Sequence, residues 1–202
     1  MEPTSSWDTL GMRGTCSIGY RLKAQGISEQ VLPVPYSRIH TQTMTPAAHI
    51  LWSSVWAGVA AAAVQKAENF VRKAMRGPSG QTPPGAASVV QAKSKLRLLR
   101  ALIVETLERY EAVHTDEEKS ASLEYQSAIA LTKVEASEMA LAIVMSCYRT
   151  CGLSGYRNDS DVSIGRHLRD ILSSPIMINN DRILANMGTT LLMSGVPNTL
   201  HK

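Results

Sequence analysis

Two groups of side chains combine residue type and spacing in a way that chemistry could use. Cys147 and Cys151 lie one helical turn apart. The chain has only three cysteines and no other ligands beside this pair, so the spacing favours two thiols packed in a core. Glu108, Glu111 and the acidic run 116–118 could bind a metal or act as acid and base, but such spacing is commoner on an exposed helix face. We therefore predict no metal site.

Several isolated positions could also contribute. His49 carries an imidazole that could act near neutral pH, although a lone histidine at a helix start is more often a surface or capping residue. Arg72 could bind a diphosphate through paired, charge-assisted hydrogen bonds, or could simply be a cation favoured near a helix C-terminus. Gly152 and Gly155 allow a tight turn and the close approach of another group. The residues alone leave both interpretations open in each case.

The elements that must position these residues are long helices. Thr45 is a good N-cap, Pro46 suits a first helical turn, and apolar residues then recur at helical spacing until Gly77-Pro78 ends the pattern. Thr115 and Glu118 resemble a capping box ahead of a third helix. The predicted helices cover about 46–76, 85–113, 117–151, 162–173 and 180–193. Their lengths and short connections predict a mainly α, antiparallel up-down bundle.

Residues 1–45 differ from the bundle in composition. They are rich in glycine and proline and lack helical periodicity. The short runs 20–22 and 30–32 could be strands, but they are too few to close a sheet without support from another part of the molecule. We therefore expect a short β/loop segment at 1–45, followed by a helical bundle domain at 46–202.

Composition narrows the classes of partner. The net charge of +4 comes from Lys and Arg residues spread along the chain, so no clustered basic face for nucleic acid is expected. The most apolar stretch, 50–64, is shorter than the ~20 residues of a membrane span. The N-terminus has no charged-then-apolar signal segment. These features predict a cytoplasmic protein with no membrane span.

Three motifs together resemble the acyl-CoA dehydrogenase family. Residues 7–15 (Trp-Asp-Thr-Leu-Gly-Met-Arg-Gly-Thr) are similar to the end of that family's β-domain, and 131–140 resembles its "A-K-x-x-A-S-E-x-A" helix. The stretch 152–156, followed by 166–170, resembles "G-G-x-G-Y … R-x-x-R-D". The resemblance covers essentially the whole chain but only about half of the family's usual length. It implies that 1–45 is a remnant of the central β-domain, and that either the gene product is truncated or a partner chain supplies the remainder.

The resemblance implies an FAD flavoprotein that is a homo-oligomer. In the family, an Arg and a Gln on the first two long helices contact the FAD pyrophosphate and adenine, commonly of the neighbouring subunit, and the matching positions are Arg72 and Gln91. The family's glycine turn passes along that FAD, which implies contacts at Gly152 and Gly155. Leu153 replaces a glycine that family members usually carry in this turn.

The resemblance also implies an oxidoreductase that acts on the CH–CH group of an acyl-CoA or related thioester. Such dehydrogenation needs a carboxylate base, but Ile178 occupies the usual position, and the alternative position at Ala47 or Ala48 has none. His49 is the only titratable group near the alternative position. For Arg169 and Asp170, the resemblance implies an ion pair with a structural role. Two alternatives follow: a flavin-dependent monooxygenase relative, or a non-catalytic helical subunit that scaffolds another flavoprotein chain.

Overall fold

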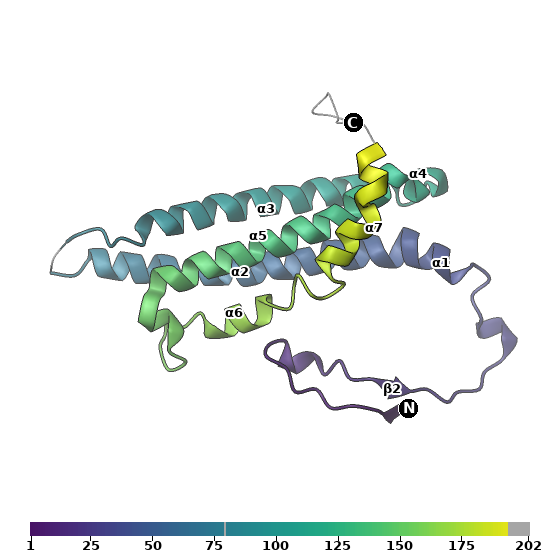
Figure 1. The fold of residues 1–202 in the computed structure, drawn as a ribbon, viewed down its shortest axis with the longest axis horizontal. Helices are drawn as coiled ribbons and strands as arrows, with labels where there is room; N and C mark the ends of the chain where they lie inside the picture. Colours follow the sequence, from purple (N-terminus) through teal and green to yellow (C-terminus); the bar gives the residue numbers. More distant parts are fainter. Residues whose placement is uncertain (79, 194–202) are drawn as a thin grey trace.

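The computed structural model describes residues 1–78 and 80–193, and three long helices dominate it (Figure 1). They are α2 (Thr45–Met75), α3 (Ala86–Val113) and α5 (Leu123–Tyr156). The helices pack side by side, with α3 antiparallel to the other two, which confirms the predicted bundle. Small side chains bring the helices close together, since the alanines at 60, 63, 67, 136 and 140 are all fully buried. Apart from Trp56, the fully buried side chains of this core are small or aliphatic.

The first long helix begins earlier than the sequence predicts. α1 (Tyr36–Ile39) and a π-helical turn, η3 (His40–Met44), run directly into α2, so Thr45 lies inside a continuous helix and is not its N-cap. The wider turn suits Pro46, because a proline inside an α-helix has no N–H to donate and its ring clashes with the carbonyl four residues earlier. The predicted N-cap at Thr45 was therefore wrong.

By length and composition alone, the continuous helical stretch Tyr36–Met75 is also long and apolar enough to cross a membrane. In the structure, 44% of its most apolar window is buried inside the protein, and core helices of soluble proteins meet the same criteria of length and composition. The expectation that the chain has no membrane span therefore stays a prediction.

A short helix, α4 (Glu117–Ala121), separates α3 from α5. Its N-cap is Asp116, whose Oδ1 accepts a hydrogen bond from the Lys119 amide at 3.0 Å, so the capping box predicted at Thr115 and Glu118 was wrong. Ser122 has an extended backbone and caps α5 with its hydroxyl. The predicted third helix is thus two helices joined at Ser122, because two side-chain caps compete within a few residues.

Two shorter helices complete the bundle. α6 (Gly165–Ile171) packs against α5 and α2, and α7 (Asn180–Met193) packs against α5. The loop between them contains Ile178, whose φ of 48° places it in the left-handed region. This conformation is rare for a β-branched residue.

The N-terminal segment lies mostly exposed beside the bundle. β1 (Glu2–Pro3) pairs antiparallel with β2 (Tyr20–Arg21), and two 3-10 turns, η1 (Arg13–Thr15) and η2 (Ser28–Gln30), follow β1 and β2. The run 30–32 forms no strand, unlike the run at 20–22. The segment contacts α6 through Gly11, where a Cβ would lie 2.0 Å from the Arg169 carbonyl oxygen. The division into a 1–45 segment and a 46–202 bundle domain stays a proposal.

Candidate functional site

The positions that the resemblance assigns to a flavin lie at one end of the bundle. Arg72 is near the C-terminal end of α2, Gln91 is in the second turn of α3, and Gly152 and Gly155 are near the C-terminal end of α5. These helix ends meet at the same side of the molecule (Figure 1). Contact between them is close, because a Cβ on Gly85, just before α3, would lie 2.8 Å from the Thr150 side chain.

Arg72 shares a carboxylate with a lysine of the next helix. Its guanidinium lies 2.6 Å from Glu68 Oε1, and Lys93 Nζ of α3 lies 3.1 Å from the same oxygen. The two cations exceed the single carboxylate by one charge. Gln91 is exposed, and within residues 1–78 and 80–193 its side chain has no hydrogen-bond partner. Arg72, Lys93 and Gln91 therefore keep donors that could bind an anion.

The glycine turn depends on glycine at both positions. Gly152 has φ 52° and ψ −135°, which interrupts the helical geometry of α5. A Cβ on Gly155 would lie 2.6 Å from the Cys151 Cβ and 3.3 Å from the Tyr148 carbonyl oxygen. Gly155 is therefore required by close packing within α5, and its carbonyl accepts a hydrogen bond from the Ile164 amide at 2.9 Å.

A buried lysine holds the loop that contains position 178. Lys133, on α5, is 0% exposed, and its Nζ donates to the Ile178 carbonyl at 2.8 Å and to Asn180 Oδ1 at 2.7 Å. The Asn180 amide in turn donates to Ser137 Oγ and to Glu138 Oε1. The Ile178 side chain is 50% exposed, so it points away from this network. The network fixes the left-handed loop onto α5.

Lys133 is an unusual cation because its hydrogen-bond partners are neutral. Burial lowers its pKa to about 8, against an opposing effect of the Glu138 carboxylate. Its Nζ also lies 5.7 Å from the centre of the Trp56 ring, within the range of a cation–π contact. The sequence interpretation missed this residue. The available signal was a lysine one turn after Ile129 and one turn before Ser137, on the same buried stripe of α5.

His49, on α2, is buried against Ile129 of α5, which lies one helical turn before Lys133. Its ring Nδ1 lies 3.1 Å from the Ile129 carbonyl oxygen, so this nitrogen carries the proton and donates it. Burial lowers the pKa of His49, the bond to Ile129 opposes this, and the positive charge of Lys133 lowers it further. The structure thus places position 178 and His49, the histidine next to the alternative base position, close to Lys133.

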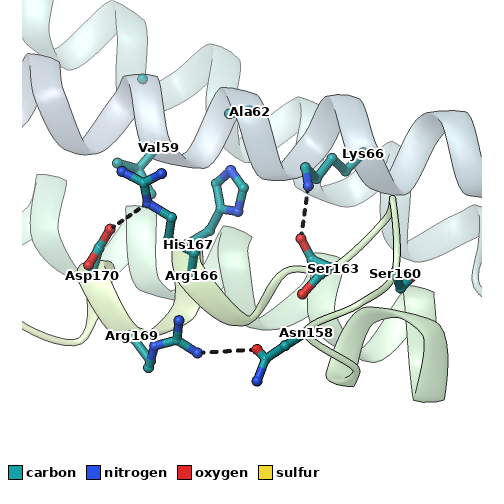
Figure 2. A pocket seen from close by; sticks show the side chains of 11 residues that line it. Val59, Ala62, Lys66, Asn158, Ser160, Ser163, Arg166, His167, Arg169 and Asp170 are labelled. Atoms are coloured by element: carbon teal, nitrogen blue, oxygen red, sulfur yellow. Dashed lines mark hydrogen bonds and ion pairs between the residues drawn. The ribbon is translucent and has the colours of Figure 1, made fainter. Parts of the chain in front are cut away.

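A groove lies between α2 and α6 (Figure 2). It has a volume of about 660 Å³. Gly58, Val59 and Ala62 of α2 form its apolar floor, and polar residues from α6 and the preceding loop form its rim. The rim contains Asn158, Ser160, Ser163, Arg166, His167, Arg169 and Asp170. Lys66 closes one end, donating to the carbonyls of Asp161 and Ser163 at 3.2 and 3.1 Å.

The predicted Arg169–Asp170 ion pair does not form. Asp170 Oδ1 accepts the Met12 amide hydrogen at 2.7 Å, and its Oδ2 lies 3.7 Å from Arg166 Nε. Arg169 instead reaches Asn158 Oδ1 at 3.5 Å (Figure 2). Neighbouring residues of a helix point in different directions, so adjacent Arg and Asp side chains do not face each other. Asp170 ties the N-terminal segment to α6.

The cysteine pair and the acidic run 116–118 have structural roles. Cys147 and Cys151 are buried in the core, which confirms that prediction, and burial raises the pKa of both thiols, that of Cys147 to about 12. Glu117, from the acidic run, pairs with Arg38. Across the described residues, no three His, Cys, Asp or Glu side chains gather as a metal site would require.

The sequence profile described as "Acyl-CoA dehydrogenase, C-terminal domain" matches residues 50–174, which is more than half of the chain. The chain belongs to this family. The match begins in α2 and ends after α6, so it includes Arg72, Gln91, the glycine turn and Lys133. No curated protein matches the sequence.

Solved structures agree with this family fold. A nitrososynthase from Micromonospora carbonacea var. africana has a TM-score of 0.74 and 22% identity, over 93% of this chain and 51% of that one. Dibenzothiophene monooxygenase (TdsC) from Paenibacillus sp. A11-2 has a TM-score of 0.70 and 18% identity, over 95% and 52%. Its complex with FMN and indole has a TM-score of 0.69 and 18% identity, over 95% and 52%. The chain spans about half the length of the structures that it matches.

Proposed function

We propose that this chain is the helical part of a flavin-dependent oxidoreductase, and that its chemistry is of the monooxygenase type. Membership of the acyl-CoA dehydrogenase family supports a flavin cofactor. Two matched proteins of this fold are a nitrososynthase and a monooxygenase, and the monooxygenase is also matched in a complex with FMN. The observation that carries the choice between dehydrogenase and monooxygenase is the surroundings of Ile178.

Dehydrogenation of an acyl-CoA thioester requires a group that removes the α-proton. At position 178 the side chain is aliphatic and half-exposed, and the polar groups behind it are Lys133 and Asn180. Glu138, which is exposed on α5, has its Oε1 engaged as the acceptor of a hydrogen bond from the Asn180 amide. Next to the alternative base position at Ala47 or Ala48, the His49 ring is buried against Ile129. Neither position itself carries a carboxylate, so we favour chemistry that does not begin with α-proton removal.

The residues present fit the phosphate of a flavin. A bound flavin, FMN or FAD, would supply the redox chemistry, which is hydride transfer and reaction with oxygen. Arg72 has the planar guanidinium that pairs with phosphate oxygens, and Lys93 adds a second cation. Gln91 offers free amide donors on the next helix. Glu68 holds both cations in place but removes one unit of charge.

A second candidate function is a helical subunit that completes another flavoprotein chain or a second copy of itself. Large apolar side chains on one face of α2 support it, since Leu51 and Val55 are 64% and 55% exposed, and Met44, in the π turn just before α2, is 48% exposed. In the α-helical part of this face, Leu51 and Val55 lie one turn apart, so they form a continuous stripe. In this case the flavin and the acyl thioester or other substrate would be held by the assembly.

Flavin binding separates the two candidates. The purified chain is incubated with FMN and, separately, with FAD, and then passed through a desalting column. Its visible absorbance measures the flavin that stays bound. The first candidate predicts a yellow protein, whereas a chain that stays colourless with both cofactors would contradict it and leave the subunit function.

Variants of Arg72 test the site itself. Arg72→Ala should lose more flavin than Arg72→Lys, because lysine keeps the charge but not the paired donors. Arg76→Ala, which removes an exposed arginine one turn later, is the matched control and should retain flavin like the parent. Equal retention in all four proteins would count against Arg72.

A further inference from the structure

We propose that the groove between α2 and α6 is a second binding site, for an organic phosphate with an apolar moiety. The proposal does not depend on the flavin. The groove is built from Lys66 of α2, the loop 158–163 and the exposed face of α6. Arg72, Gln91 and the two glycines of the turn are not among its lining residues.

The charges of the groove favour an anion. Lys66, Arg166 and Arg169 are three cations, and Asp170 is the one carboxylate among the lining residues. With His167 neutral, the lining has a net charge of +2. Of the two acidic residues on the loop, Asp159 is paired with Arg157 at 2.6 Å, and Asp161 is exposed; neither is among the lining residues.

The cations of the groove keep unused hydrogen-bond donors. Arg166 has an 87% exposed side chain and only a 3.7 Å ion pair, with Asp170. Arg169 has one long hydrogen bond, to Asn158. Figure 2 shows the Arg166 and Lys66 side chains in the space between α6 and α2, with His167 between them. A phosphate group could accept from two of these donors at once, the arrangement that makes such pairs strong.

The size and floor of the groove indicate an organic ligand. A volume of about 660 Å³ exceeds what a phosphate group fills and lies in the range of sites for small organic molecules. The floor consists of Val59, Ala62 and the bare backbone of Gly58, where an added Cβ would meet nothing within 4 Å. A flat or apolar moiety could lie on this floor while the phosphate faces the rim.

His167 gives a local readout of an anion in the groove. Its Nδ1 is buried and has no hydrogen-bond partner in the described chain. Burial lowers the pKa of this ring, the charges of Lys66 and Arg166 lower it further, and Asp170 opposes them. A polyanion bound among these cations should raise the pKa of His167, and NMR titration of the ring with and without pyrophosphate measures the change.

Calorimetric titration with three probes tests the ligand class. We expect ADP to bind more tightly than pyrophosphate, and adenosine without phosphate to give no measurable binding. Added salt should weaken the binding of both ADP and pyrophosphate, because the groove is open to solvent. Failure of both ADP and pyrophosphate to bind would overturn the site, and equal affinity for the two would overturn its organic part.

Charge variants locate the bound phosphate. The double variant Arg166→Gln, Arg169→Gln should bind ADP about tenfold more weakly or worse, since it lacks two charged donors. Arg182→Gln, on the exposed surface of α7, is the control and should change the affinity less than about twofold. If Arg72→Ala weakens ADP binding and the double variant does not, ADP binds at the flavin positions. The groove proposal then fails, while the proposed function survives.

A neutral variant tests the floor. Gly58→Leu adds volume to the floor of the groove without a change in charge, and its Cβ meets nothing within 4 Å. The variant should reduce the affinity for ADP several-fold more than it reduces the affinity for pyrophosphate. An unchanged ADP affinity would contradict the assignment of the apolar moiety to this floor.

Discussion

Lys66 and Lys133 each donate two hydrogen bonds to oxygens of another segment, but their surroundings are opposite. Lys66 reaches two loop carbonyls at the edge of an open groove. Lys133 is fully buried, and its two bonds are shorter, to Ile178 and Asn180. Water can replace the partners of the first lysine and cannot reach those of the second. The difference indicates that Lys133 stabilises a fixed loop, whereas the Lys66 region keeps donors that a ligand can use.

The largest expected effect comes from Lys133. Lys133→Ala leaves a cavity and two buried acceptors without a donor, so the free energy of unfolding should fall by about 3 kcal/mol. Lys133→Met fills the volume and removes the cost of burying a charge, so its loss should be smaller. Urea unfolding of both variants measures this. A Lys133→Ala variant as stable as the parent would contradict a structural role for this network.

The pH dependence of stability should distinguish the buried lysine. The pKa of Lys133 is lowered to about 8 in the folded chain from 10.5, so the unfolded chain binds more protons between these values. Stability from this group therefore rises with pH from about 8 to 10.5. Relative to Lys133→Met, the parent should gain stability across that window in urea unfolding, a comparison in which other titrating groups cancel. A constant difference would show that the pKa is not lowered.

A smaller effect is expected at Asp170, which joins the groove to the N-terminal segment. Asp170→Ala leaves the Met12 amide without its acceptor, at a cost of about 1 kcal/mol. The segment 1–35 should then be cleaved faster by a protease, which gel electrophoresis follows. Asp170→Asn keeps an acceptor oxygen and is the control. Identical cleavage of all three proteins would show that this contact does not hold the segment.

The smallest effect is expected at Lys66. Lys66→Met removes hydrogen bonds that water can replace, so the free energy of unfolding should change by about 0.5 kcal/mol or less. Urea unfolding beside the Lys133 variants makes the comparison direct. A loss as large as that of Lys133→Ala would mean that Lys66 holds the groove loop in place, and the contrast between the two lysines would fail.

The helices could be predicted because their signals are local. Gly77-Pro78 stops α2, and the apolar spacing of α3 agrees with its observed bounds. The start of α2 was missed because Thr45-Pro46 has the local pattern of a helix start, and only the π turn shows that the helix continues upstream. Asp116 and Thr115 are both residue types that cap helices well, so residue type alone could not show which of them caps α4.

The polar contacts of the site could not be predicted because their partners are distant in sequence. Met12 and Asp170 are 158 positions apart, and Lys133 and Ile178 are 45 apart. No periodicity links such pairs. The family resemblance gave the places of Arg72 and the glycine turn, but it gave no reason to expect that Glu68 shares its charge with Arg72.

The π turn at His40–Met44 also sets which way the first residues of the helix face. Each residue of an α-helix turns the chain by about 100°, so one extra residue in a turn rotates everything before it by that angle. Here Arg38, which precedes the turn, pairs with Glu117, and within the turn the Thr41 carbonyl accepts a hydrogen bond from the Gln126 side chain. Deletion of a single residue between 40 and 44 would rotate Arg38 away from Glu117 while α2 keeps its own register.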